Sequence, residues 1–66
     1  MNWVLIVETV HGSHAITLTR DEADAVKALD EAQAVIGKSG IVRICNRLTL
    51  KAEDITAAKI EQRYVG

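Results

Sequence analysis

The amino-acid sequence predicts a small α+β domain in which one helix packs on a mainly antiparallel sheet, with the element order ββαβββ. Three observations support this fold class: short β-branched, apolar runs occur near both ends, a segment with helical periodicity lies between them, and glycine-containing turns separate these parts. The chain has 66 residues, of which 48% are hydrophobic. This length allows one core, so we expect a single domain over residues 1–66.

The first predicted element is a strand over residues 2–10. Its uninterrupted apolar segment 3–7 indicates a central strand that is buried on both faces. The Gly-Ser pair at 12–13 fits a two-residue type II′ turn, because glycine tolerates the positive φ of the first turn position. Such a turn sets His11 opposite His14. It also predicts one shared apolar face, made by Leu5, Val7, Ile16 and Leu18.

A helix is predicted over residues 20–36. Thr19 and Glu22 have the spacing of a capping box, in which the two side chains satisfy unpaired backbone N–H groups at the helix start. Gly37 suits the end of the helix. The predicted core-facing stripe is Val26, Leu29, Ala32 and Ile36, with Ala25 and Gln33 beside them.

A second hairpin is predicted from two short strands, 41–44 and 48–50. A three-residue loop, 45–47, sets Ile44 opposite Leu48, whereas a two-residue turn would set apolar residues opposite polar ones. We therefore expect the three-residue loop. On the outward face of this hairpin we expect Arg43, Thr49 and Lys51.

The C-terminal segment, residues 54–64, allows two interpretations. It contains good helix formers, but Ala58, Ile60 and Tyr64 alternate as on a half-exposed strand. We expect a strand, which completes the ββαβββ order. This order is common among short bacterial and phage proteins, but such an architecture assigns no functional site.

Charge and cysteine content exclude several classes of protein. The net charge is −1, so the concentrated basic field of a typical nucleic-acid-binding protein is missing. The single cysteine, Cys45, cannot form an internal disulfide and fits a reducing compartment. The apolar segment 3–7 is too short for a signal peptide or a membrane span. We therefore expect an unprocessed cytoplasmic protein with no membrane partner.

Three groups of residues have side chains suited to chemistry, and we expect no catalytic, cofactor or metal site from any of them. His11 and His14 supply only two ligands, which is too few for a tight transition-metal site. Cys45 follows a strand and lacks the helix N-terminus that lowers the pKa of a reactive thiol. The Gly-Lys-Ser sequence at 37–39 ends a helix instead of preceding one, so it does not form a phosphate-binding loop.

The sequence favours a small non-catalytic protein-interaction module, of accessory, adaptor or inhibitor type, that acts as a homo-oligomer and binds a further protein. A chain of this size buries only about 60% of its unfolded surface, so a partner subunit, most simply in a dimer, would stabilise it. One helix also covers only one face of a sheet. The expected interface residues are Trp3, Val4, Ile6, Val10 and Tyr64.

The alternative is a nucleic-acid-binding regulator that uses the basic face of the second hairpin. Its anionic-partner contacts would be Arg43, Arg47 and Lys51. Few exposed aromatics accompany these bases, and single-stranded nucleic acid is usually held by stacking on aromatic side chains. Nucleic acid is therefore a less expected partner than protein.

Calorimetric titration with Zn²⁺ is expected to show no micromolar or tighter binding at the His11–His14 hairpin, because two imidazoles hold the ion too weakly. Micromolar binding that disappears in His11→Ala would contradict this expectation.

Overall fold

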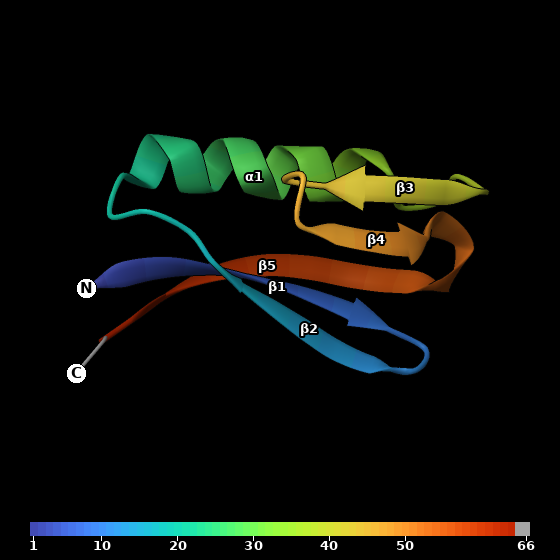
Figure 1. The fold of residues 1–66 in the computed structure, drawn as a ribbon, viewed down its shortest axis with the longest axis horizontal. Helices are drawn as coiled ribbons and strands as arrows, with labels where there is room; N and C mark the ends of the chain where they lie inside the picture. Colours follow the sequence, from blue (N-terminus) through green and yellow to red (C-terminus); the bar gives the residue numbers. More distant parts are fainter. Residues whose placement is uncertain (65–66) are drawn as a thin grey trace.

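One helix and a small hairpin lie on the same side of a three-stranded antiparallel sheet (Figure 1). The structure, a computed structural model, describes residues 1–64. The elements are β1 (Asn2–Thr9), β2 (Gly12–Thr17), α1 (Glu22–Ala34), β3 (Ile41–Ile44), β4 (Leu48–Lys51), a short 3-10 helix η1 (Ala52–Asp54) and β5 (Ile55–Arg63). The main sheet has the strand order β2-β1-β5, and β3 pairs with β4. The α+β class, the ββαβββ order, the central first strand and the C-terminal strand are confirmed.

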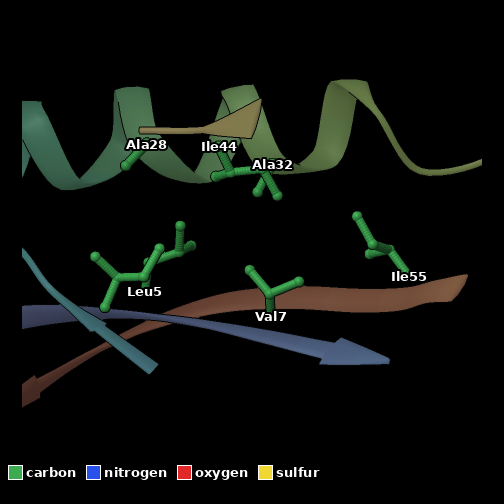
Figure 2. Close-up of a cluster of buried hydrophobic side chains, with 7 residues drawn as sticks. Leu5, Val7, Ala28, Ala32, Ile44 and Ile55 are labelled. Atoms are coloured by element: carbon green, nitrogen blue, oxygen red, sulfur yellow. The ribbon is translucent and has the colours of Figure 1, made fainter. Parts of the chain in front are cut away.

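The core lies between β1 and α1 (Figure 2). Leu5 and Val7 point from β1 toward the helix, and Ile44 of the second hairpin enters the same space; all three side chains are fully buried. Alternate residues of a strand face the same side, so β1 supplies two core residues from adjacent positions of that face. Burying each such side chain contributes about 1.5–3 kcal/mol.

The predicted helix stripe is confirmed at Ala25, Leu29 and Ala32 and wrong at Val26, Gln33 and Ile36. The helix buries three alanines against the sheet: Ala25, Ala28 and Ala32. Alanine has no side chain beyond Cβ, so the helix backbone lies close to β1 and the apolar stripe rotates away from the bulkier positions. Val26 and Ile36 are 43% and 36% exposed as a result. Gln33 is exposed as well.

The first hairpin turns two residues earlier than predicted. Its turn residues are 10 and 11, because Thr9 pairs with Gly12. His14 therefore lies opposite Val7 and not opposite His11, so the type II′ turn and the predicted histidine pair are wrong. The register differs from the predicted one by four residues. Because this shift is an even number of residues, each side chain stays on the predicted face of the hairpin. Leu5, Val7, Ile16 and Leu18 therefore share one face, as predicted.

The side chain of Thr9 explains this turn. Its Oγ1 accepts a hydrogen bond from the backbone N–H of His11 at 3.1 Å and donates to the carbonyl oxygen of Gly12 at 2.8 Å. Threonine side chains commonly hold turns through such local bonds. Gly12 then follows the turn with a φ of 129°, a conformation that suits glycine.

The helix begins at Glu22 with Asp21 as its N-cap, so the predicted capping box is wrong. The backbone N–H of Ala23 donates to Asp21 Oδ1 at 2.9 Å. Thr19 lies two residues before the N-cap, and its Oγ1 accepts a hydrogen bond from the N–H of Asp21 at 3.2 Å. Thr19 therefore orders the segment before the helix, and the carboxylate of Asp21 accepts the hydrogen bond from the first helical turn.

The second hairpin has the predicted register. Ile44 pairs with Leu48, and the loop between them spans residues 45–47. Cys45 and Asn46 have φ values of 54° and 56°, and the N–H of Arg47 donates to the carbonyl oxygen of Ile44 at 3.1 Å. Positive φ at both central positions is the geometry of a type I′ turn, which matches the twist of the flanking strands.

Asp21→Ala is expected to lower the free energy of unfolding by about 0.5–2 kcal/mol, because the variant loses the N-cap acceptor. Thr19→Ala serves as the comparison and should cost less, because its hydroxyl does not cap the helix. Urea unfolding of both variants measures the difference. A larger loss in Thr19→Ala than in Asp21→Ala would contradict the N-cap assignment.

Candidate functional site

The far side of β5 is an open edge of the main sheet. Along its other side, β5 pairs with β1 from Asn2–Arg63 to Thr9–Ile55. Within residues 1–64, no backbone hydrogen bond joins the far side of β5 to another segment. The strand is nine residues long. An edge of this length is a template on which another strand can pair.

The backbone groups that face this open edge belong to Ala58, Ile60 and Gln62. The N–H of Leu18 donates to the carbonyl oxygen of Trp3, so the backbone of Trp3 faces the β2 side. Orientation alternates along an antiparallel strand, so the even-numbered residues of β1 face β5. These even-numbered residues pair with odd-numbered residues of β5. The even-numbered residues of β5 therefore direct their N–H and C=O groups outward.

The opposite edge of the sheet, β2, is less accessible. This strand has six residues. The guanidinium Nη1 of Arg47 donates to the carbonyl oxygen of Thr17, the last residue of β2. The β3–β4 loop thus occupies part of this edge, and β5 remains the longer open one.

Charged side chains alternate in sign along the outer face of β5, the face turned away from α1. Lys59, Glu61 and Arg63 share this face because their partners on β1 are Ile6, Val4 and Asn2. Arg63 Nε donates to Glu61 Oε1 at 2.6 Å. These residues were not among those expected to form a site, although their alternating charge is visible in the printed sequence.

The predicted interface residues differ widely in exposure. Val4 and Ile6 also lie on the outer face, yet they are only 4% and 8% exposed. Side chains of the flanking strands cover them: Glu61 lies beside Val4 and Lys59 beside Ile6.

The other predicted interface residues retain more surface. Trp3 is half-buried, whereas Val10 and Tyr64 are 64% and 85% exposed. Val10 lies in the β1–β2 turn, and Tyr64 directly follows β5. The structure does not bring these residues into one patch, and the interface stays a prediction.

The predicted anionic-partner contacts are divided between two places. Arg43 pairs with Thr49 and Lys51 with Ile41, so both bases lie on the outward face of the second hairpin, as predicted. The side chain of Arg47 instead points toward β2, where it donates a hydrogen bond to the carbonyl oxygen of Thr17. Two cations therefore remain on that face.

A cavity of about 490 Å³ opens between α1, the end of β2 and the β3–β4 loop. Its lining residues are Leu18, Thr19, Asp24, Lys27, Ala28, Glu31, Cys45 and Arg47. Glu31 Oε1 accepts a hydrogen bond from the backbone N–H of Cys45 at 3.4 Å, and Cys45 Sγ donates to Glu31 Oε2 at 3.8 Å. The carboxylate thus holds the strained loop against the helix.

The environment of Cys45 disfavours its thiolate. Burial raises the pKa of the thiol, and the negative charge and hydrogen bond of Glu31 raise it further, while Arg47 acts in the opposite direction. A nucleophilic cysteine needs a lowered pKa. This arrangement can stabilise a loop, but it does not activate a thiol.

The two histidines lie apart from this cavity. His11 Nε2 is 3.5 Å from Asp54 Oδ2, and the N–H of Val10 donates to the carbonyl oxygen of Asp54 at 3.0 Å. These contacts join the β1–β2 turn to the start of β5. Among residues 1–64, no three potential metal ligands come together. Within the same range, no helix is long and apolar enough to cross a membrane.

Comparisons of this chain with protein-family models, with curated proteins and with solved structures gave no match.

Glu31→Gln is expected to lower the pKa of the Cys45 thiol and to speed its reaction with a disulfide reagent near neutral pH. The change removes a negative charge beside the sulfur, which favours the thiolate. Measuring the reaction rate against pH tests this, with Asp24→Asn in the same cavity as the control. An identical pH profile for Glu31→Gln and the unchanged protein would contradict the assigned role of Glu31.

Proposed function

We propose that this protein is a small non-catalytic protein-interaction module, of accessory, adaptor or inhibitor type, that binds an extended segment at the open edge of β5. We also propose that it works as a homo-oligomer in the cytoplasm. The observation that carries the proposal is the outward-facing backbone at Ala58, Ile60 and Gln62. In strand addition, main-chain hydrogen bonds supply affinity and alternate side chains supply specificity.

The side chains next to this edge support strand addition. Ala58 and Ile60 face α1 and are only half-buried in the isolated chain. An added strand would remove more of their apolar surface from water, which stabilises a small domain at about 25 cal/mol per Å². No proline interrupts the chain, so every backbone group along the edge is free to pair.

A nucleic-acid-binding regulator is the second candidate. It would act through Arg43 and Lys51, which share the outward face of the second hairpin. The hydrogen bond from Arg47 to Thr17 takes the third predicted cation out of this group. Two cations give a weak attraction for phosphate, and this attraction would fall as salt rises.

Amide hydrogen exchange is expected to separate the two sides of β5. In dilute protein, the amides of Ile60 and Gln62 should exchange fast, because they face the open edge, whereas those of Lys59 and Glu61 should be protected by β1. Raising the protein concentration should protect the first pair as the edge becomes occupied. Fast exchange of the Ile60 and Gln62 amides at every concentration would contradict strand addition by a homo-oligomer.

Gln62→Pro provides the matched variant for this experiment. It removes an outward N–H, and proline is tolerated on edge strands where the N–H faces solvent. Protection of Ile60 should be lost, while the fold stays intact by circular dichroism. If nucleic acid protects the second hairpin instead, and salt removes that protection, the regulator becomes the better assignment.

A further inference from the structure

We propose that β5 pairs with β5 of a second copy of this chain, antiparallel and centred on Ile60, so that one continuous sheet runs through both copies. The proposal rests on the proposed function and names both the occupant of the open edge and its register. It differs from the sequence-based expectation, in which the interface residues were Trp3, Val4, Ile6, Val10 and Tyr64.

Two-fold symmetry restricts how two such edges can meet. A two-fold axis perpendicular to the sheet makes the paired strands antiparallel and keeps both helices on the same side. Residues directly opposite each other then share a face, so outer-face residues must meet outer-face residues. The centre of the pairing is therefore a single residue, and the allowed registers differ by which residue occupies it.

Among the registers centred on Lys59, Ile60 or Glu61, the middle of the charged segment, the charges on the outer face favour the one centred on Ile60. With Ile60 at the centre, Lys59 lies opposite Glu61 of the partner subunit, and the symmetric contact repeats this pair. With Lys59 at the centre, two lysines would face each other. With Glu61 at the centre, two glutamates would meet and Lys59 would face the partner's Arg63. Opposite charges across strands stabilise pairing and like charges weaken it.

The same register places the charged pairs at the closest positions. The backbone of Ile60 faces the open edge, so the two central residues would exchange hydrogen bonds. The Lys59–Glu61 pairs would then be the non-hydrogen-bonded pairs, whose Cα atoms are about 4.5 Å apart. Size also matches, because Gln62 would lie opposite the partner's Ala58 and Arg63 opposite the partner's Ala57.

The exposed flank of α1 independently supports this arrangement. Asp24, Lys27 and Glu31 line the cavity beside the β3–β4 loop and the end of β2. Val26 lies on the opposite flank of the helix, because residues are spaced by about 100° around its axis. That flank therefore faces the β5 edge of the sheet. Its exposed apolar surface has no other cover within residues 1–64.

A second copy at β5 would supply this cover. The helix lies against both β1 and β5. Because neighbouring strands are about 4.8 Å apart, the helices of the two copies would lie about 10 Å apart. This is the usual distance between packed helices. The helix flanks containing Val26 would then meet across the two-fold axis.

Charge reversal tests the register. Lys59→Glu alone and Glu61→Lys alone each place like charges opposite each other, so each should raise the dimer dissociation constant about tenfold or more. The double variant K59E/E61K should recover dimerisation. An equimolar mixture of the two single variants should form a mixed dimer, because the two acidic side chains of one variant would face the two basic side chains of the other. Sedimentation over a concentration series measures all four samples.

Matched controls change the same charge elsewhere. Lys27→Glu and Asp24→Lys alter the cavity flank of α1, which lies away from the β5 edge, and should leave the dissociation constant unchanged. Circular dichroism of each variant in dilute solution shows whether it folds. If a single variant does not fold, the double variant and Gln62→Pro still test the edge, because recovery and loss of dimer are expected for them respectively.

Two results would overturn the proposal in different ways. If the unchanged protein dimerises with protected Ile60 and Gln62 amides but the mixed single variants do not associate, the register is wrong and strand addition stands. If the unchanged protein stays monomeric with fast exchange at both amides, strand addition by a second copy and the proposed homo-oligomer are both wrong.

Discussion

The fold depends on the burial of β1 between two neighbouring strands and beneath one helix. Four consecutive residues of this strand, Val4 to Val7, are buried, although only one face of the sheet is covered by other elements. The inner pair contacts α1 and the second hairpin. The outer pair is covered by side chains from β2 and β5. The helix and the second hairpin are held in place by their contact with this buried row.

The sequence allowed the coarse fold to be predicted, because its strongest patterns extend over several residues. The apolar run at 3–7 indicated the central strand, and the facing of Ile44 and Leu48 indicated the loop length. Both predictions rest on the burial of whole side-chain rows. A change of register by one residue would expose an entire row, so this signal is strong.

The positions of the first turn and of the helix N-cap depended on competing hydrogen bonds. The hydrophobic pattern of the sequence does not show which of these bonds forms. Gly12 could belong to a turn or follow one, and the hydroxyl of Thr9 decides between them. Asp21 and Thr19 are both good N-cap residues, and the extended backbone of Asp21 brings its carboxylate to Ala23. The helix stripe was mispredicted for another reason, since close approach to a sheet favours alanine over larger apolar residues.

The open edge could not be found from the sequence because it is a property of strand order. Both strands that flank β1 have alternating apolar and polar residues, so their sequences do not show which of them has an open edge. Only the strand order β2-β1-β5 shows which edges lack a neighbour. The cavity beside Cys45 has the same origin, since Glu31 and Cys45 are far apart along the chain and meet only in the folded protein. Features that depend on contacts between residues far apart in the chain were therefore not predictable from the sequence patterns and are visible only in the folded structure.

The contact between Arg47 and Thr17 affects the second edge of the sheet. A protein with two open sheet edges can add copies without end and form a fibre, as cross-β structures do. Here the guanidinium of Arg47 donates to the carbonyl oxygen of Thr17, at the end of β2. In the proposed dimer, a strand that approaches β2 would therefore find one of its backbone acceptors already used. This contact weakens β2 as a template for further strand pairing, which would disfavour open-ended growth of the proposed dimer.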